Sequence, residues 1–322
     1  MSEIKLEKLK LENDETMAYR HAGHGDNKVI LIHGFQSSSR FFEVLLENLV
    51  ENDENIEVFA PDLIGYGESS YKNKHKDISD WSKDLKYFSD ILNLKDFNLL
   101  GWSLGGLVAM DFAGLYPDMI KQLILLSSVG VKGFIMPKDK EVKDDNKNLK
   151  LPNFLKNFNI KHDQSFTVPI LNGIKDHDIN FFEDLFRQTI FNVNDPNPDD
   201  LKTMAEDFLK QRCFLESLLA MVTYNNTSDG GSGLIEKINK KVTWFHGRKD
   251  MVIPISDAYK SLKYFPNKVN FVEFENSGHA IFIDEKEKFV KLFEELIKNE
   301  SWNFNHLYFN YINFFNTTYY LR

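Results

Sequence analysis

Cysteine is nearly absent from this sequence. Cys213 is the only cysteine among 322 residues, so no intramolecular disulfide can form. Its neighbours Phe214 and Leu215 are apolar, which predicts a thiol buried in the core rather than a nucleophile. Residues 1–6 mix charged and apolar side chains and lack the apolar run of a secretory signal. We therefore expect a protein of a reducing compartment, with the cytoplasm as its location.

Positive charge is also scarce. Lysine and arginine total 39 against 48 aspartates and glutamates, which gives a formal net charge of −9. This balance argues against nucleic acid or an anionic membrane as a partner. The nine histidines never form the pattern His-x-x-x-His, and none stands near Cys213 in a ligand pattern. We expect neither a metal ion nor any other cofactor.

The sequence does contain a series of short apolar runs, a pattern typical of strands buried on both faces of a sheet. Between them apolar residues recur at helical spacing, most clearly over 78–94. Strands that alternate with helices favour the α/β class, with a doubly wound, mostly parallel sheet. Two extended segments before the first run, 5–11 and 16–21, predict an opening hairpin. The apolar runs are 28–32, 58–60, 97–100, 122–128, 241–247 and 269–274.

The middle of the chain departs from this alternation. A charged, asparagine-rich stretch is followed by two helical patterns and a Gly-Ser hinge. We therefore assign 1–130 and 241–300 to one core domain and 131–240 to a helical cap inserted into it. Residues 301–322 form an aromatic, asparagine-rich tail of unknown role, whose asparagines make a membrane-spanning helix costly, so no transmembrane span is expected. The helical patterns cover 180–191 and 199–224.

One serine occupies a position that predicts a nucleophile. Ser103 stands in the pattern G-x-S-x-G, directly after a buried strand and directly before an apolar helical run. A serine that attacks a carbonyl must project from a sharp, strained turn, and Gly101 and Gly105 relieve the crowding there. The helix that follows directs its free N–H groups toward a developing oxyanion, and the amide of Leu104 is the nearest donor.

Two later strands end in residues that complete this chemistry. Asp250 follows the run 241–247, and His279 follows the run 269–274. Serine, acid and histidine in this chain order are typical of hydrolases with this architecture. A serine hydroxyl is a weak nucleophile at neutral pH, so His279 would accept its proton as general base. Asp250 would orient the imidazole and stabilise its positive charge.

These residues make the chain similar to the serine hydrolases of the α/β-hydrolase fold, over about residues 5–298. The segment His33-Gly34-Phe35 also matches that family, as does Asp62, which we interpret as structural. The resemblance implies that the backbone N–H of Phe35 is the second oxyanion donor beside Leu104, and that His33 is structural. The sequence around Ser103 most resembles that of pimeloyl-carrier-protein methyl ester esterases, although the insertion here is longer than theirs.

The resemblance implies a carboxylesterase-like, cofactor-free serine hydrolase that cleaves carboxylic esters through an acyl-enzyme on Ser103. The many large apolar side chains of 131–240, with no evident basic clamp among them, favour a small ester that is neutral and apolar on its acyl side. Two alternatives remain open. One is a related hydrolase of C–C or amide bonds, since one triad serves several leaving groups, and the other is a non-enzymatic receptor for a small ligand. The oligomeric state does not follow from the sequence.

Overall fold

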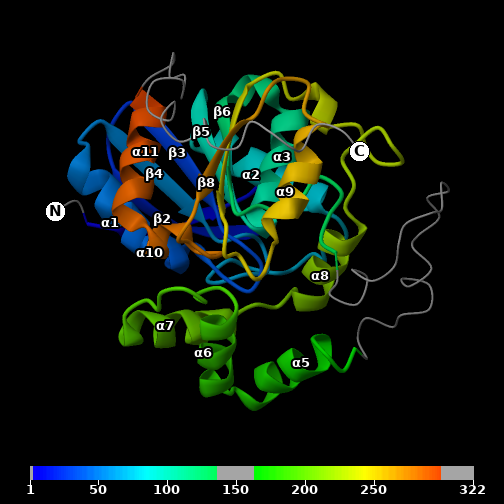
Figure 1. Ribbon diagram of the computed structural model, residues 1–322. Coiled ribbons are helices and arrows are strands. Elements are labelled where there is room, and N and C mark those ends of the chain that lie inside the picture. Colours follow the sequence, from blue (N-terminus) through cyan, green and yellow to red (C-terminus); the bar gives the residue numbers. More distant parts are fainter. Residues whose placement is uncertain (1–2, 136–162, 299–322) are drawn as a thin grey trace.

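The computed structural model describes residues 3–135 and 163–298, which form one sheet of eight strands (Figure 1). The strand order is β1-β2-β4-β3-β5-β6-β7-β8. β2 pairs antiparallel with both β1 and β4, and all other neighbours pair parallel. The predicted α/β class with a mostly parallel sheet is therefore confirmed. The strands are β1 Lys5–Lys10, β2 Thr16–Gly23, β3 Asn27–Ile32, β4 Ile56–Pro61, β5 Phe97–Trp102, β6 Ile120–Leu126, β7 Lys241–Gly247 and β8 Asn270–Phe274.

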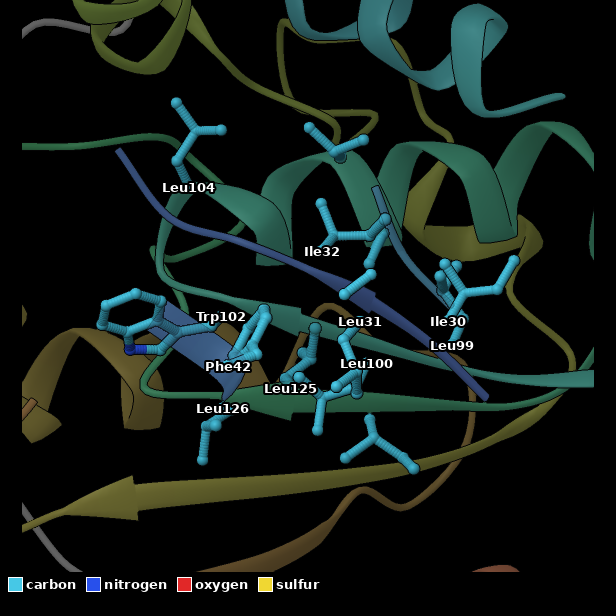
Figure 2. Close-up of a cluster of buried hydrophobic side chains, with 14 of the residues drawn as sticks. Ile30, Leu31, Ile32, Phe42, Leu99, Leu100, Trp102, Leu104, Leu125 and Leu126 are labelled. Carbon is cyan, nitrogen blue, oxygen red and sulfur yellow. The ribbon is translucent and has the colours of Figure 1, made fainter. Parts of the chain in front are cut away.

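Helices cover both faces of this sheet (Figure 1). α1 packs against α11 on one face, and α2 packs against α3 on the other. Because no face is left to solvent, the central strands can be apolar at every position. Leu31 of β3 and Leu100 of β5, partners in the ladder, are fully buried (Figure 2). The core helices are α1 Glu43–Asn52, α2 Ile78–Ile91, α3 Leu104–Leu115, α9 Ile255–Leu262, α10 Ile281–Asp284 and α11 Lys286–Lys298, with 3₁₀ turns at Ser39–Phe42, Pro117–Met119 and Ile235–Lys237.

Four further helices of the described chain lie between β6 and β7 in sequence, within the segment predicted to be a cap. α5, α6 and α7 lie together at one end of the molecule, and α8 leads back toward the sheet (Figure 1). The boundaries of the cap, 131–240, stay a prediction. Part of it, 136–162, and the tail 301–322 lie outside the described residues. The helices are α5 Thr167–Asp176, α6 Ile179–Gln188, α7 Pro198–Phe208 and α8 Phe214–Thr223.

The helical pattern predicted over 199–224 is divided between α7 and α8. Arg212 accounts for the break. Its backbone N–H donates to the carbonyl of Gly65 at 2.8 Å, and its guanidinium donates to the carbonyls of Gly67 and Ser69. These acceptors belong to the loop after β4, so the break depends on contacts between distant parts of the chain and cannot be read from local spacing.

Phenylalanines join the inserted helices to the core. The rings of Phe182 on α6 and Phe208 on α7 lie 4.4 Å apart, centroid to centroid. Phe186 packs on Phe208 and also on Phe41, which belongs to the core turn before α1. All four side chains are fully or almost fully buried. Much of the apolar surface of α6 and α7 is thus used for packing and not for lining a pocket.

Asp111 is a carboxyl group enclosed in the core on α3. Its side chain is 2% exposed, Ser79 Oγ donates to its Oδ1 at 3.3 Å, and its Oδ2 has no partner in the described structure. Burial raises the pKa of Asp111 from 3.8 to about 6. Because the folded protein holds this proton more tightly than the unfolded chain, the free energy of unfolding falls as the pH rises through this window. The loss is on the order of 3 kcal/mol.

We therefore expect Asp111→Asn to change how stability depends on pH. The amide has the shape of the carboxyl group but no charge, so the variant does not lose the stability that the wild type loses as the pH rises from about 4 to about 6. Urea unfolding at pH 4 and pH 8 measures this. The free energy of unfolding of the variant, relative to wild type, should rise by about 2–3 kcal/mol between the two pH values. If the difference in free energy of unfolding between variant and wild type is the same at pH 4 and pH 8, the Asp111 carboxyl group is not the source of this pH dependence.

Candidate active site

Ser103 lies at a sharp turn between β5 and α3. Its backbone has φ 56° and ψ −120°, in the left-handed region that L-residues rarely adopt. The turn leaves no room for larger neighbours. A Cβ atom on Gly105 would lie 2.2 Å from the carbonyl oxygen of Ile32, and one on Gly101 would lie 2.3 Å from the carbonyl oxygen of Gly105. The two glycines therefore permit the elbow that holds the serine at the end of the strand.

The two predicted oxyanion donors, the backbone amides of Leu104 and Phe35, belong to segments that adjoin this serine. Leu104 is the first residue of α3, so its N–H points out of the helix end and has no acceptor within the helix. Phe35 follows Gly34, whose added Cβ would lie 2.9 Å from Ser103 Cβ. The ring of Phe35 stacks on that of Phe214 of α8, with centroids 5.2 Å apart. The loop after β3 and the start of α3 thus flank the serine, as an oxyanion hole requires.

Asp250 and His279 are in direct contact. The Nδ1 atom of His279 and Oδ2 of Asp250 are 2.8 Å apart, and both side chains are buried. The other carboxylate oxygen, Oδ1, accepts the N–H groups of Val252 at 2.9 Å and Ile253 at 2.8 Å. Because a carboxylate can only accept, Nδ1 of His279 carries the proton. In the neutral imidazole this tautomer leaves Nε2 free to act as a base.

Trp102 connects this pair to the serine. It directly precedes Ser103, its indole N–H donates to the carbonyl of His279 at 3.0 Å, and the two rings lie 5.4 Å apart. The loop that carries His279 is held from the other side by Asp284, which accepts the N–H of Gly278 at 2.7 Å. The structure thus brings together the ends of β5, β7 and β8, from which the three predicted catalytic residues follow.

His246 is a neighbour of the acid to which the sequence reasoning gave no role. It is fully buried, and its Nε2 donates to the carbonyl of Ile253 at 2.9 Å while its Nδ1 accepts the indole N–H of Trp244 at 3.2 Å. Nε2 also lies 3.5 Å from Oδ2 of Asp250. Burial lowers the pKa of His246, so it stays neutral. The only sign of this role in the sequence is that His246 stands four residues before Asp250. Its contacts hold the loop that carries Asp250.

His33 and Asp62 have the contacts of structural residues. Nε2 of His33 accepts the N–H of Leu63 at 3.0 Å. The Asp62 carboxylate accepts the N–H groups of Ser39 and Glu68, both at 2.8 Å. Burial lowers the pKa of His33, which keeps the ring neutral. Both side chains fix the loops beside the elbow and lie fully buried.

Cys213 is fully buried, as predicted, and burial raises the pKa of its thiol to about 12. Within residues 3–135 and 163–298, no group of three or more histidine, cysteine, aspartate or glutamate side chains is arranged to hold a metal ion. In the same ranges, no helix combines the length and apolar character that crossing a bilayer requires.

A parallel sheet with a serine at a strand–helix elbow, and an aspartate–histidine pair after later strands, defines an α/β hydrolase. The chain belongs to that family, since the model of the alpha/beta hydrolase fold matches residues 27–286. The resemblance inferred from the sequence is thereby confirmed.

Relatives span most of the chain. It is similar to the AB hydrolase superfamily protein YisY of Bacillus subtilis, 25% identical over 299 residues that cover 88% of this chain and 96% of that protein. An esterase from Exiguobacterium antarcticum has a TM-score of 0.69 at 19% identity, covering 91% of this chain and 99% of its own. A 2-hydroxy-6-oxo-6-phenylhexa-2,4-dienoate hydrolase from Rhodococcus sp. strain RHA1 has a TM-score of 0.68 at 16% identity, covering 93% and 100%. At these identities the two structures show the fold alone. Membership of the alpha/beta hydrolase family is what supports a hydrolase.

Proposed function

We propose that this chain is a serine hydrolase that cleaves carboxylic esters without a cofactor. The observation that carries the proposal is the 2.8 Å hydrogen bond between Asp250 and buried His279, on a loop bonded to the residue before Ser103. That bond fixes the imidazole tautomer that can accept a proton, and a serine on a strained elbow is the group that would give it up.

The reaction runs in two halves. Ser103 Oγ attacks the ester carbonyl carbon while its proton passes to Nε2 of His279, and the new oxyanion accepts the N–H groups of Phe35 and Leu104. Collapse of this intermediate breaks the bond to the alcohol, which leaves with the proton from His279. A water molecule then attacks the acyl carbon and gives a proton to His279. The bond between that carbon and Ser103 Oγ breaks, Oγ takes the proton from His279, and the acid is released. Asp250 stays ionised and stabilises the imidazolium in both halves.

The charges of the inserted helices support a neutral substrate. Arg187 on α6 is 3.3 Å from Glu183, 3.3 Å from Asp184 and 3.4 Å from Asp195, so its charge is balanced within the insertion. Arg212 donates to backbone carbonyls of the loop after β4. The two arginines of the segment 131–240 are thus engaged in other contacts.

A panel of substrates tests the proposal. The purified protein is assayed with p-nitrophenyl butyrate, the matched p-nitroanilide and 2-hydroxy-6-oxo-6-phenylhexa-2,4-dienoate. The values of kcat/KM for the three substrates are then compared. We expect the ester to be hydrolysed at least about a hundredfold faster than the amide, because an alcohol leaves more readily than an amine. Faster cleavage of the dienoate would make the chain a C–C hydrolase. Tight ligand binding with no turnover of any substrate would make it a receptor.

A further inference from the structure

Asn192, which lies between α6 and α7, reaches the acid loop, the loop after β7 that carries Asp250. Its side-chain Nδ2 donates to the carbonyl of Lys249 at 3.0 Å, and Lys249 directly precedes Asp250. The N–H of Lys249 in turn donates at 2.9 Å to the carbonyl of Ser277, which belongs to the histidine loop, the loop after β8 that carries His279. The carboxamide of Asn192 is thus bonded to a residue at which the two loops are joined.

The oxygen of the same carboxamide lies against the histidine loop. A Cβ atom added to Gly278, the residue before His279, would lie 2.2 Å from Oδ1 of Asn192. Gly278 does not have a left-handed backbone, so the close approach of Asn192 is what favours a glycine at this position. Oδ1 is buried and accepts no hydrogen bond in the described structure. Asn192 is therefore packed between the residues that precede the proposed acid and the proposed base.

Phe191 fixes the place of Asn192. Its side chain is 2% exposed, and its ring lies 6.3 Å from that of Phe41 and 6.5 Å from that of Phe186, centroid to centroid. Phe41 belongs to the core turn before α1, so the chain is attached to the core directly before Asn192. A buried aromatic side chain in the adjacent position leaves the backbone of Asn192 little freedom to move away.

A second bond joins the insertion to the histidine loop. The backbone N–H of Asn194 donates to Oδ1 of Asp284 at 3.0 Å, and Oδ2 of the same carboxylate accepts the N–H of Gly278 at 2.7 Å. Because a carboxylate accepts at both oxygens, Asp284 holds both amides at once. The segment 192–194 therefore contacts the acid loop at Lys249, and the histidine loop both directly and through Asp284.

The histidine loop has need of such support. β8 is the outer strand at its end of the eight-stranded sheet, so none of the described strands lies beyond it. Transfer of the Ser103 proton depends on where this loop places the imidazole of His279, and a misplacement of about 1 Å can reduce a rate about a hundredfold. Within residues 3–135 and 163–298, Asn192 has no hydrogen bond to Ser103, Asp250 or His279. Its effect on the reaction therefore passes through the two loops.

We propose that Asn192 is a positioning residue of the esterase, whose carboxamide holds the acid and histidine loops where Asp250 and His279 bond to each other. The inference rests on the proposed function and adds to it a contribution of the insertion to the chemical step. Because Asn192 acts on the placement of the base, its loss should slow the reaction and leave binding of the ester nearly unchanged.

Asn192→Ala removes the carboxamide and keeps the backbone. We expect kcat for p-nitrophenyl butyrate to fall at least about tenfold, with KM changed by less than about threefold. Labelling of Ser103 by a fluorophosphonate should slow in parallel, because it needs the same activated serine. A merely structural role predicts a lower unfolding temperature, with kcat, KM and the labelling rate kept at temperatures where the variant is folded.

Gly278→Ala tests the contact independently. Its new methyl group would take the place of Oδ1 of Asn192 and displace the carboxamide from Lys249. We expect Gly278→Ala and Asn192→Ala to reduce kcat by similar factors. The double variant should lose less than about threefold beyond Asn192→Ala alone, because the space for the methyl group is then free. Losses that multiply in the double variant would overturn the contact as their common cause.

Asn48→Ala is the matched control. Asn48 is also half-buried and donates from Nδ2 to a backbone carbonyl, that of Val44 at 2.7 Å, but it lies on α1. Its substitution should change kcat by less than about twofold. If Asn192→Ala keeps the kcat and the labelling rate of wild type, Asn192 has no positioning role. If the wild type neither hydrolyses an ester nor is labelled, the proposed function is what has failed.

Discussion

Ser103→Ala will leave the protein folded and will reduce kcat for ester hydrolysis by about 10⁴-fold or more. Alanine carries a Cβ atom as serine does, so the substitution adds no new steric conflict at this left-handed position and the elbow between β5 and α3 is kept. The hydroxyl is the only group proposed to form the acyl-enzyme, and without it only the amides of Phe35 and Leu104 still assist attack by water. Ester kinetics and thermal unfolding of the variant measure the two effects.

Ser127→Ala is the matched control for this experiment. Ser127 directly follows β6, is fully buried, and has a left-handed backbone with φ 42°. Its substitution should change ester hydrolysis by less than about threefold, because no step of the proposed reaction uses it. A fluorophosphonate should label wild type and Ser127→Ala but not Ser103→Ala. Labelling of Ser103→Ala at the wild-type rate would refute the nucleophile assignment.

Most of the sheet could be predicted from the sequence because its interior strands are buried on both faces. The run predicted over 241–247 coincides with β7, and the run over 97–100 lies within β5. α1 and α9 were not predicted. α9 is only eight residues long and follows directly after the acid loop, so its apolar periodicity covers barely two turns. Short helices of this kind are stabilised mainly by packing against the sheet, which the sequence does not display.

The residues of the candidate site could be predicted from the sequence for a different reason. Parallel strands bring their carboxyl ends to one edge, so residues that directly follow strands converge even when they are far apart in sequence. His279 and Asp250 are 29 positions apart in the chain and hydrogen-bonded in the fold. Features that depend on side-chain packing between loops could not be predicted from the sequence. The support that His246 gives to the acid loop belongs here.

Asp250→Asn will reduce kcat by about 10⁴-fold while leaving the fold and KM nearly unchanged, by analogy with the same change in serine proteases. The amide is the size of the carboxylate, and its oxygen can still accept the N–H groups of Val252 and Ile253. This orientation turns the NH₂ group toward Nδ1 of His279. A donor at that place requires an unprotonated Nδ1, so the imidazole proton moves to Nε2.

The tautomer change accounts for the size of the expected loss. With a proton on Nε2, His279 cannot accept the proton of Ser103, and the positive charge that would form on the ring has no carboxylate beside it. A merely structural role for Asp250 predicts the opposite pattern, a lower unfolding temperature with kcat largely kept. Kinetics, thermal unfolding and the rate of fluorophosphonate labelling separate the two, with Asp199→Asn as the control for loss of an exposed acidic charge. Because labelling also needs an activated serine, it should slow in parallel with kcat. A variant that keeps more than a tenth of the wild-type kcat would show that His279 does not depend on Asp250 for its tautomer.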